Sequence, residues 1–181
     1  MRQFIRQGDG TLVLVSSVLG KTPLPYLTVY NAAKHGVAGL AASLRADLKE
    51  EGLADRVKVC NLMPPSTDTP FYVHAANYAG RVPRPPPPVY DAETLAKAIV
   101  EAVDDPREEV TVGAMGKLMV ASHEVLQGLY EKLAGPYTEL MFLDEPAPRS
   151  DGSVFAPVPQ GRTAEGGWKE GTLMEKRRGM E

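Results

Sequence analysis

Residues 11–17 have the sequence Thr-Leu-Val-Leu-Val-Ser-Ser, and this stretch decides the fold class. Its four consecutive apolar residues, two of them branched at Cβ, favour a β-strand. A run without polar interruption is typical of a strand that is buried on both faces, as in parallel sheets. Gly20, Pro23 and Pro25 follow, so we expect a loop directly after the strand.

Further helices and strands are expected to alternate along the chain. Residues 28–51 contain many alanines and no proline, and Gly52 stands where a helix would stop. The remaining predicted elements are a strand over residues 56–62, a helix that Asp91 caps and Pro106 ends, and a strand over residues 109–113. This order of strand, helix, strand, helix and strand predicts a parallel α/β architecture with right-handed crossovers.

The sequence changes character after Gly113. We expect residues 114–145 to form a helical extension, because apolar residues keep helical spacing to about Ala134. The positions that carry this spacing are Leu118, Val125, Leu126, Leu129 and Leu133. Residues 146–181 are rich in proline and glycine, which predicts a loop or disordered tail with Phe155 and Trp168 as docking points.

Composition excludes several classes of protein. The 181 residues suffice for one domain with a modest appendage, and 43% of them are hydrophobic, an ordinary globular value. A net charge of -3 gives no electrostatic reason to expect a nucleic-acid or anionic-membrane partner. The single cysteine excludes an internal disulfide and a cysteine-based zinc site, and we predict no metal. The sequence has no signal peptide and no apolar run approaching the ~20 residues of a membrane span, so a cytoplasmic protein is expected.

Three residues form a candidate catalytic set. Ser17 ends the first strand, and Tyr30 and Lys34 stand four residues apart, on one face of the predicted helix. A phenol has a pKa of about 10. A positive charge ~4 Å away, at an effective dielectric of ~20, contributes up to about 4 kcal/mol, or roughly three pKa units. We therefore expect Lys34 to bring the pKa of Tyr30 close to neutrality, where Tyr30 could act as a general acid or base, with Ser17 holding a substrate oxygen against it.

These residues also carry a resemblance to a known family. The segment Ser16-Ser17-x-x-Gly20, followed thirteen residues beyond Ser17 by Tyr30-Asn-Ala-Ala-Lys34, resembles the short-chain dehydrogenase/reductase family. Residues 61–69, Asn-Leu-Met-Pro-Pro-Ser-Thr-Asp-Thr, look like the PGxxxT segment of the family, with Pro65 where glycine is usual. The similarity covers about residues 4–113. The TGxxxGxG turn and the NNAG motif of the family have no counterpart here, so the chain resembles the C-terminal half of such an enzyme, in a truncated form.

The resemblance implies a fold, an activity and a set of roles. The fold implied is the C-terminal part of a Rossmann-like doubly wound parallel sheet, with residues 1–113 as a partial catalytic domain. The activity implied is hydride transfer between NAD or NADP and a carbonyl or alcohol substrate. The resemblance assigns catalysis to Ser17, Tyr30 and Lys34. It assigns cofactor binding to Tyr30, Lys34, Pro65, Ser66, Thr67 and Thr69.

A second interpretation is a non-catalytic interaction module, or an inactive remnant, that associates with a complete subunit of this family. The helix over residues 28–51 has a face of small residues (Ala32, Gly36, Gly39 and Ser43), which is either a close-packing surface or, as the resemblance implies, the interface of a homo-oligomer. The strand over residues 11–16 would lack a partner on one side, so self-association through this edge is also expected. The substrate and the choice between NAD and NADP cannot be predicted from this sequence.

Overall fold

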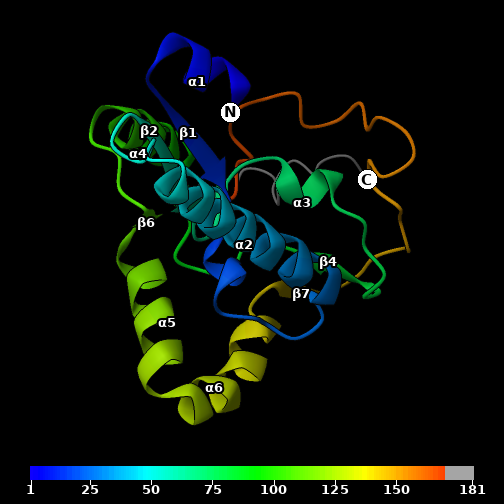
Figure 1. The fold of residues 1–181 in the computed structure, drawn as a ribbon. Coiled ribbons are helices and arrows are strands. Elements are labelled where there is room, and N and C mark those ends of the chain that lie inside the picture. Colours follow the sequence, from blue (N-terminus) through cyan, green and yellow to red (C-terminus); the bar gives the residue numbers. More distant parts are fainter. Residues whose placement is uncertain (170–181) are drawn as a thin grey trace. The chain divides into compact units, whose positions relative to one another are not determined.

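The computed structural model describes residues 1–169 and divides the chain into two compact units (Figure 1). The first unit comprises Met1–Pro65 and Thr94–Ala134, and the second comprises Ser66–Glu93 and the chain from Gly135 onward. Each unit is described separately below. None of the described helices is both long enough and apolar enough to cross a membrane.

The first unit is built on a parallel sheet. Strands β1 (Gly10–Val15), β2 (Val57–Met63) and β6 (Glu109–Thr111) lie in the order β1-β2-β6, and both pairings are parallel. The register places Leu12 opposite Val59 and Leu62 opposite Val110. The predicted parallel α/β architecture is therefore confirmed.

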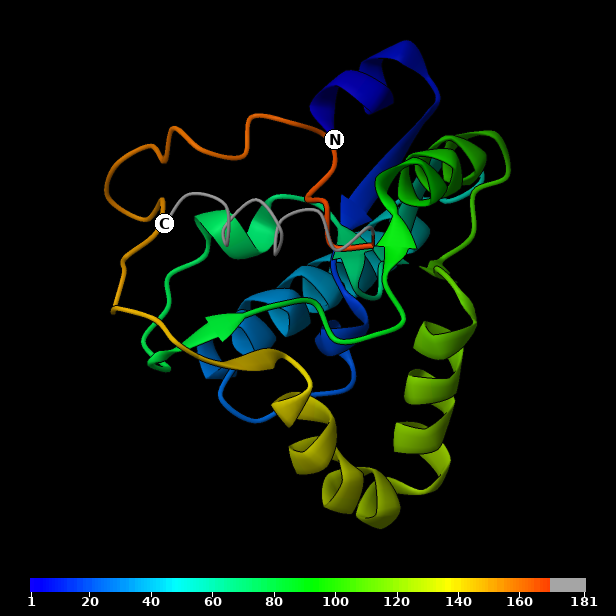
Figure 2. The same ribbon diagram turned by 180° about the vertical axis from the view of Figure 1, so that it is seen from behind.

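Helices cover both faces of this sheet (Figures 1 and 2). On one face, Ala41 and Leu48 of α2 (Thr28–Glu50) pack against Val57 and Val59 of β2. On the other face, Ala102 of α4 (Ala92–Asp104) packs in a cluster with three residues of the sheet and its end, Cys60, Leu62 and Val112. The two clusters follow from the alternation of side chains along β2, which is the central strand.

The strand β1 differs from its prediction. We expected it to be buried on both faces, but Gly10–Leu14 are half-buried and Val15 is 41% exposed. The reason is its position at the sheet edge, where β2 is its only neighbour within the described residues. The fully flanked strand is β2, of which every residue except Lys58 is buried.

The predicted helical extension is two helices and a strand. Helix α5 (Ala114–Val125) ends at Leu126, whose backbone is not helical, and α6 (Gln127–Glu139) is followed by β7 (Phe142–Pro146). The five apolar positions that carried the prediction do not face the core. Leu118, Val125, Leu126, Leu129 and Leu133 are each more than 50% exposed. The buried side chains of the two helices are Met119, Tyr130, Ala134 and Thr138, so the side chains that turn inward are not those five apolar residues.

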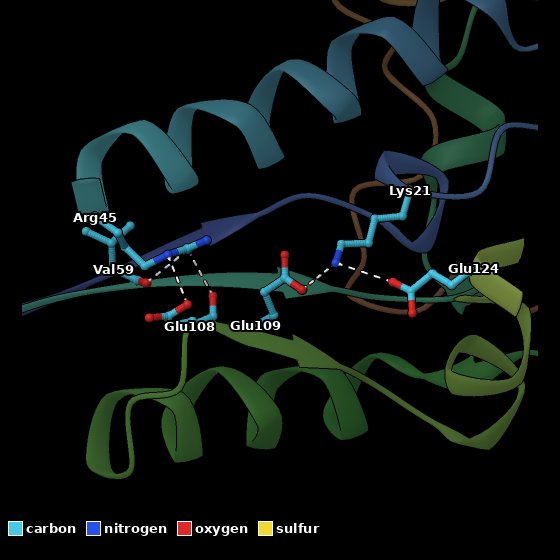
Figure 3. Close-up of polar contacts among 6 residues, drawn as sticks. All are labelled: Lys21, Arg45, Val59, Glu108, Glu109 and Glu124. Atoms are coloured by element: carbon cyan, nitrogen blue, oxygen red, sulfur yellow. Dashed lines mark hydrogen bonds and ion pairs between the residues drawn. The ribbon is translucent and has the colours of Figure 1, made fainter. Parts of the chain in front are cut away.

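Polar side chains fix the start of β6 in the first unit (Figure 3). Lys21 forms ion pairs with Glu109 and Glu124. Arg45 of α2 donates to the carbonyl oxygens of Glu108 and Val59, at 3.1 and 3.4 Å. Exposed ion pairs stabilise a fold by only ~0–1 kcal/mol each, so their main effect here is to position the loop before β6.

The second unit contains two small sheets and one short helix. Strands β3 (Thr67–Asp68) and β5 (Tyr90–Asp91) pair in parallel, and β4 (Arg81–Pro83) pairs antiparallel with β7. Helix α3 (Phe71–His74) follows β3 directly. Residues 147–169 contain no helix or strand, and residues 170–181 lie outside the described part.

Candidate active site

The turn after β1 explains the spacing Ser-Ser-x-x-Gly. Ser17 is the N-cap of the short 3₁₀ helix η1 (Val18–Gly20), and its Oγ accepts a hydrogen bond from the Leu19 amide at 3.1 Å. Ser16 points to α2 and donates from Oγ to the Lys34 carbonyl oxygen at 2.8 Å. The two serines therefore have different tasks. Ser17 shapes the turn, and Ser16 ties the turn to the long helix.

Gly20 completes this turn because nothing larger fits. A Cβ at this position would lie 2.4 Å from Ser16 Oγ and 2.8 Å from the Lys34 carbonyl oxygen. The backbone of η1 therefore approaches α2 closely at the residue that carries the candidate catalytic ammonium. Sequence analysis used Gly20 only as part of a motif, whereas the structure gives the physical reason for it.

Two side-chain hydrogen bonds fix the loop that leads into α2. Asn31 Nδ2 donates to the Leu24 carbonyl oxygen at 2.8 Å. The buried Tyr130 of α6 donates from its phenol to the Thr22 carbonyl oxygen at 3.0 Å. These contacts hold the first turn of α2, which contains Tyr30, from both sides.

The structure brings the three predicted catalytic residues together. A hydrogen bond joins the side chains of Ser17 and Tyr30. The Lys34 ammonium lies 5.6 Å from the centroid of the Tyr30 ring and donates to the Val15 carbonyl oxygen at 3.2 Å. The site thus lies at the carboxyl end of β1, the end of a parallel strand at which α/β proteins bind ligands.

The pKa of Tyr30 moves against our expectation. Burial raises the pKa of the phenol above its ordinary value of 10.0, and the hydrogen bond from Ser17 offsets this only in part. Burial also lowers the pKa of Lys34. The predicted shift toward neutrality is wrong for this structure. The ammonium lies over the ring face and is bonded to Val15, so it does not favour the phenolate.

The remaining predicted cofactor residues fall into both units. Pro65 belongs to the first unit and lies beside η1, since a Cβ at Gly116 would be 2.9 Å from Val18 Cγ1 and 3.7 Å from Pro65 Cβ. Ser66, Thr67 and Thr69 belong to the second unit. There the Ser66 carbonyl oxygen accepts from the Tyr90 amide, and the Thr67 carbonyl oxygen accepts from the Thr69 amide, both at 2.9 Å.

Sequence analysis missed one residue of this segment, Asp68. Its side chain is buried, and its Oδ1 accepts a hydrogen bond from the Trp168 backbone amide at 2.9 Å. The available signal was an acidic residue between two threonines, in the segment that follows the apolar strand, since a carboxylate is rarely buried without a partner.

Comparisons with known proteins show which family this chain resembles. Residues 1–77, which include Ser17, Tyr30 and Lys34, match the family model for short chain dehydrogenases. The chain is 28% identical over 125 residues to the uncharacterized oxidoreductase YxnA of Bacillus subtilis (strain 168), a match covering 68% of this chain and 35% of that protein.

Two crystal structures share the fold. A short chain dehydrogenase from Burkholderia cenocepacia J2315, in complex with NADP, matches 73% of this chain and 50% of its own with a TM-score of 0.58 and 23% identity. A short-chain dehydrogenase from Streptomyces avermitilis matches 74% of this chain and 52% of its own, with a TM-score of 0.53 and 22% identity. The matches therefore span about a third to a half of the length of these three proteins.

The close approach at Gly20 yields a first prediction. Gly20→Ala should destabilise the protein by about 1–3 kcal/mol, because the added methyl group meets Ser16 and the α2 backbone. Gly36→Ala, within α2, is the matched control. No atom lies within 4 Å of its new Cβ, so it should stabilise the helix by up to ~1 kcal/mol. Urea unfolding of both variants measures the difference, and equal stabilities would contradict the packing described.

The environment of Tyr30 yields a second prediction. Because burial raises its pKa, the phenol should ionise above pH 10 in the protein without ligand. The ultraviolet titration of the wild type minus that of Tyr30→Phe isolates this one phenol among the seven. By linkage, a raised pKa stabilises the folded state fully below pH ~10, and this stabilisation is lost as the pH rises through the folded pKa. A titration midpoint below 10 would contradict the structure.

Proposed function

The chain belongs to the short-chain dehydrogenase family, and from this premise we propose that it acts in NAD(P)-dependent hydride transfer between a carbonyl and an alcohol. The observation that supports this activity best is the hydrogen bond between Ser17 and Tyr30, with Lys34 against the Tyr30 ring. A hydroxyl, a phenol and an ammonium at the carboxyl end of β1 provide an oxygen-binding group and a proton donor.

The proposed chemistry assigns one task to each side chain. In the reducing direction, the Tyr30 phenol gives its proton to the carbonyl oxygen of the substrate, and Ser17 donates a hydrogen bond to the same oxygen. Burial keeps the phenol protonated, which is the form this step requires. A bound nicotinamide cofactor supplies the hydride that the carbonyl carbon receives. In the reverse direction Tyr30 accepts the proton of the alcohol.

In the first unit, the donor groups of Tyr30 and Lys34 suit the nicotinamide ribose of such a cofactor. We assign the ribose hydroxyls to Tyr30 and Lys34, whose phenol and ammonium match them in hydrogen-bonding character. The backbone from Pro65 to Thr67 is assigned to the carboxamide, and Thr69 to the carboxamide or a phosphate. The 181 residues contain no glycine-rich turn after a strand, so no pyrophosphate site is assigned to this chain. A cytoplasmic location stays a prediction.

Catalysis by Tyr30 has a direct test. Tyr30→Phe should lower the rate of carbonyl reduction by about 100-fold or more, because general acid catalysis contributes at least that factor. Tyr26→Phe is the matched control, since Tyr26 lies in the same loop region and is 76% exposed. Steady-state rates with NADH and NADPH over a panel of aldehydes and ketones measure both variants. Wild-type rates in Tyr30→Phe would exclude Tyr30 as the acid.

A second candidate function, association with another chain, is favoured by the open edge of β1. The amides of Gly10 and Ser16 donate toward β2, to the carbonyl oxygens of Arg56 and Leu62. Backbone groups alternate sides along a strand, so those of Thr11, Val13 and Val15 face the edge. This edge can pair with a strand of another chain. The small face of α2 is also exposed, and association through it stays a prediction.

Sedimentation velocity over a concentration series tests the open edge. The wild type should form dimers or larger species. Thr11→Pro should shift the distribution toward monomer, because proline removes an amide from the edge without removing a bond to β2. Gly36→Ala is the control for association through α2. A wild type that stays monomeric at all concentrations would exclude this function.

A further inference from the structure

The C-terminal part of the chain is attached to the segment that was assigned to the cofactor. Residues 150–169, here called the strap, run past α3 within the second unit (Figures 1 and 2). At its start, Ser150 forms two backbone hydrogen bonds with Asn77, at 2.7 and 2.9 Å. Further along, the Ser153 amide donates to the His74 carbonyl oxygen at 2.8 Å. His74 Nε2 donates to the Gln160 carbonyl oxygen, also at 2.8 Å.

The end of the strap makes the contacts that matter for function. Asp68 is 6% exposed, and its carboxylate accepts the Trp168 amide at 2.9 Å and the Lys169 amide at 3.5 Å. Bonds to an ionised acceptor are stronger than bonds between neutral groups, and a buried carboxylate depends on them. Asp68 is therefore the anchor of the strap.

The Trp168 side chain fixes the neighbouring residue, Thr69. Its Nε1 donates to the Thr69 carbonyl oxygen at 3.1 Å, while the Thr69 amide donates to the Thr67 carbonyl oxygen at 2.9 Å. Both backbone polar groups of Thr69 are thus engaged. The indole also packs edge-on against Tyr72 of α3, with ring centroids 5.8 Å apart.

Gly166 allows this close approach. A Cβ there would lie 2.3 Å from the Thr69 carbonyl oxygen, so the strap lies directly against the backbone of Thr69. By contrast, Phe155, in the middle of the strap, is 84% exposed. Of the two aromatic docking points that the sequence predicts, Trp168 docks and Phe155 does not.

We propose that the strap holds the turn Thr67–Thr69 in one conformation, and that Trp168 is a positioning residue for the contacts of Thr67 and Thr69 with the nicotinamide cofactor. The positioning role rests on the proposed function. Without the strap, the Asp68 carboxylate and the Thr69 carbonyl oxygen lose these hydrogen bonds, so the turn is less constrained beyond the pairing of β3 with β5. An ordered turn binds a ligand more tightly because it does not lose conformational freedom on binding.

The attachment of the strap is tested without a cofactor. Trp168 is the only tryptophan of the chain, so its fluorescence reports on this contact alone. Asp68→Ala should raise the constant for acrylamide quenching by ~2-fold or more, and Asp68→Asn, which keeps one acceptor, should give an intermediate value. Phe155→Ala is the matched control and should behave as the wild type. If the quenching constant of Asp68→Ala equals that of the wild type, the proposal that Asp68 anchors the strap is wrong.

The positioning role is tested with NADH and NADPH. Trp168→Phe keeps an aromatic ring but removes the hydrogen bond to Thr69. It should raise the Kd, measured by nicotinamide fluorescence, by about 3- to 10-fold, as expected for one lost hydrogen bond. Its thermal unfolding midpoint should match that of Phe155→Ala, which separates positioning from general stability. An unchanged Kd would overturn the role of Trp168. If the wild type binds neither NADH nor NADPH, both the proposed function and the positioning role of Trp168 are wrong. The quenching experiment would still show whether Asp68 anchors the strap.

Discussion

The contact between the turn after β1 and helix α2 is the constraint on which the candidate site depends. Gly20 has no side chain, and Ser16 donates to the Lys34 carbonyl oxygen, so the turn is held against one particular residue of the helix. Tyr30 lies one helical turn before that residue. Backbone packing therefore sets the distance between Tyr30 and Ser17. The phenol and the serine hydroxyl form a hydrogen bond with each other directly.

At Tyr30, burial and the hydrogen bond to Ser17 act on the pKa in opposite directions, and burial prevails. A nearby ammonium lowers the pKa of a phenol most when it lies close to the oxygen, which carries most of the charge of the phenolate. Here the Lys34 ammonium lies over the ring and is bonded to Val15. The phenol is accordingly protonated at neutral pH, which suits its proposed role as a proton donor.

Local patterns predicted most of the first unit but little of the second. The apolar runs predicted the strands, and the spacing of Ser17 and Tyr30 predicted that these two residues lie close together. Both predictions depend on residues that are near one another in the sequence. Helical period did not show which face of α5 is buried, because Leu118 satisfies the same pattern as a core residue. The bond between Asp68 and Trp168 joins positions 100 residues apart, and no periodicity encodes such a contact.

The open edge and the candidate site share one atom, the Val15 carbonyl oxygen. It faces the edge of β1, and it is the acceptor that holds the Lys34 ammonium at 3.2 Å. A strand that paired along this edge would compete for the same carbonyl, because a ladder uses the groups of alternate residues. Pairing would therefore bring a second donor to the acceptor of Lys34 and weaken its hold on the ammonium. The two proposed functions are then not independent, since filling the edge changes the charge beside Tyr30.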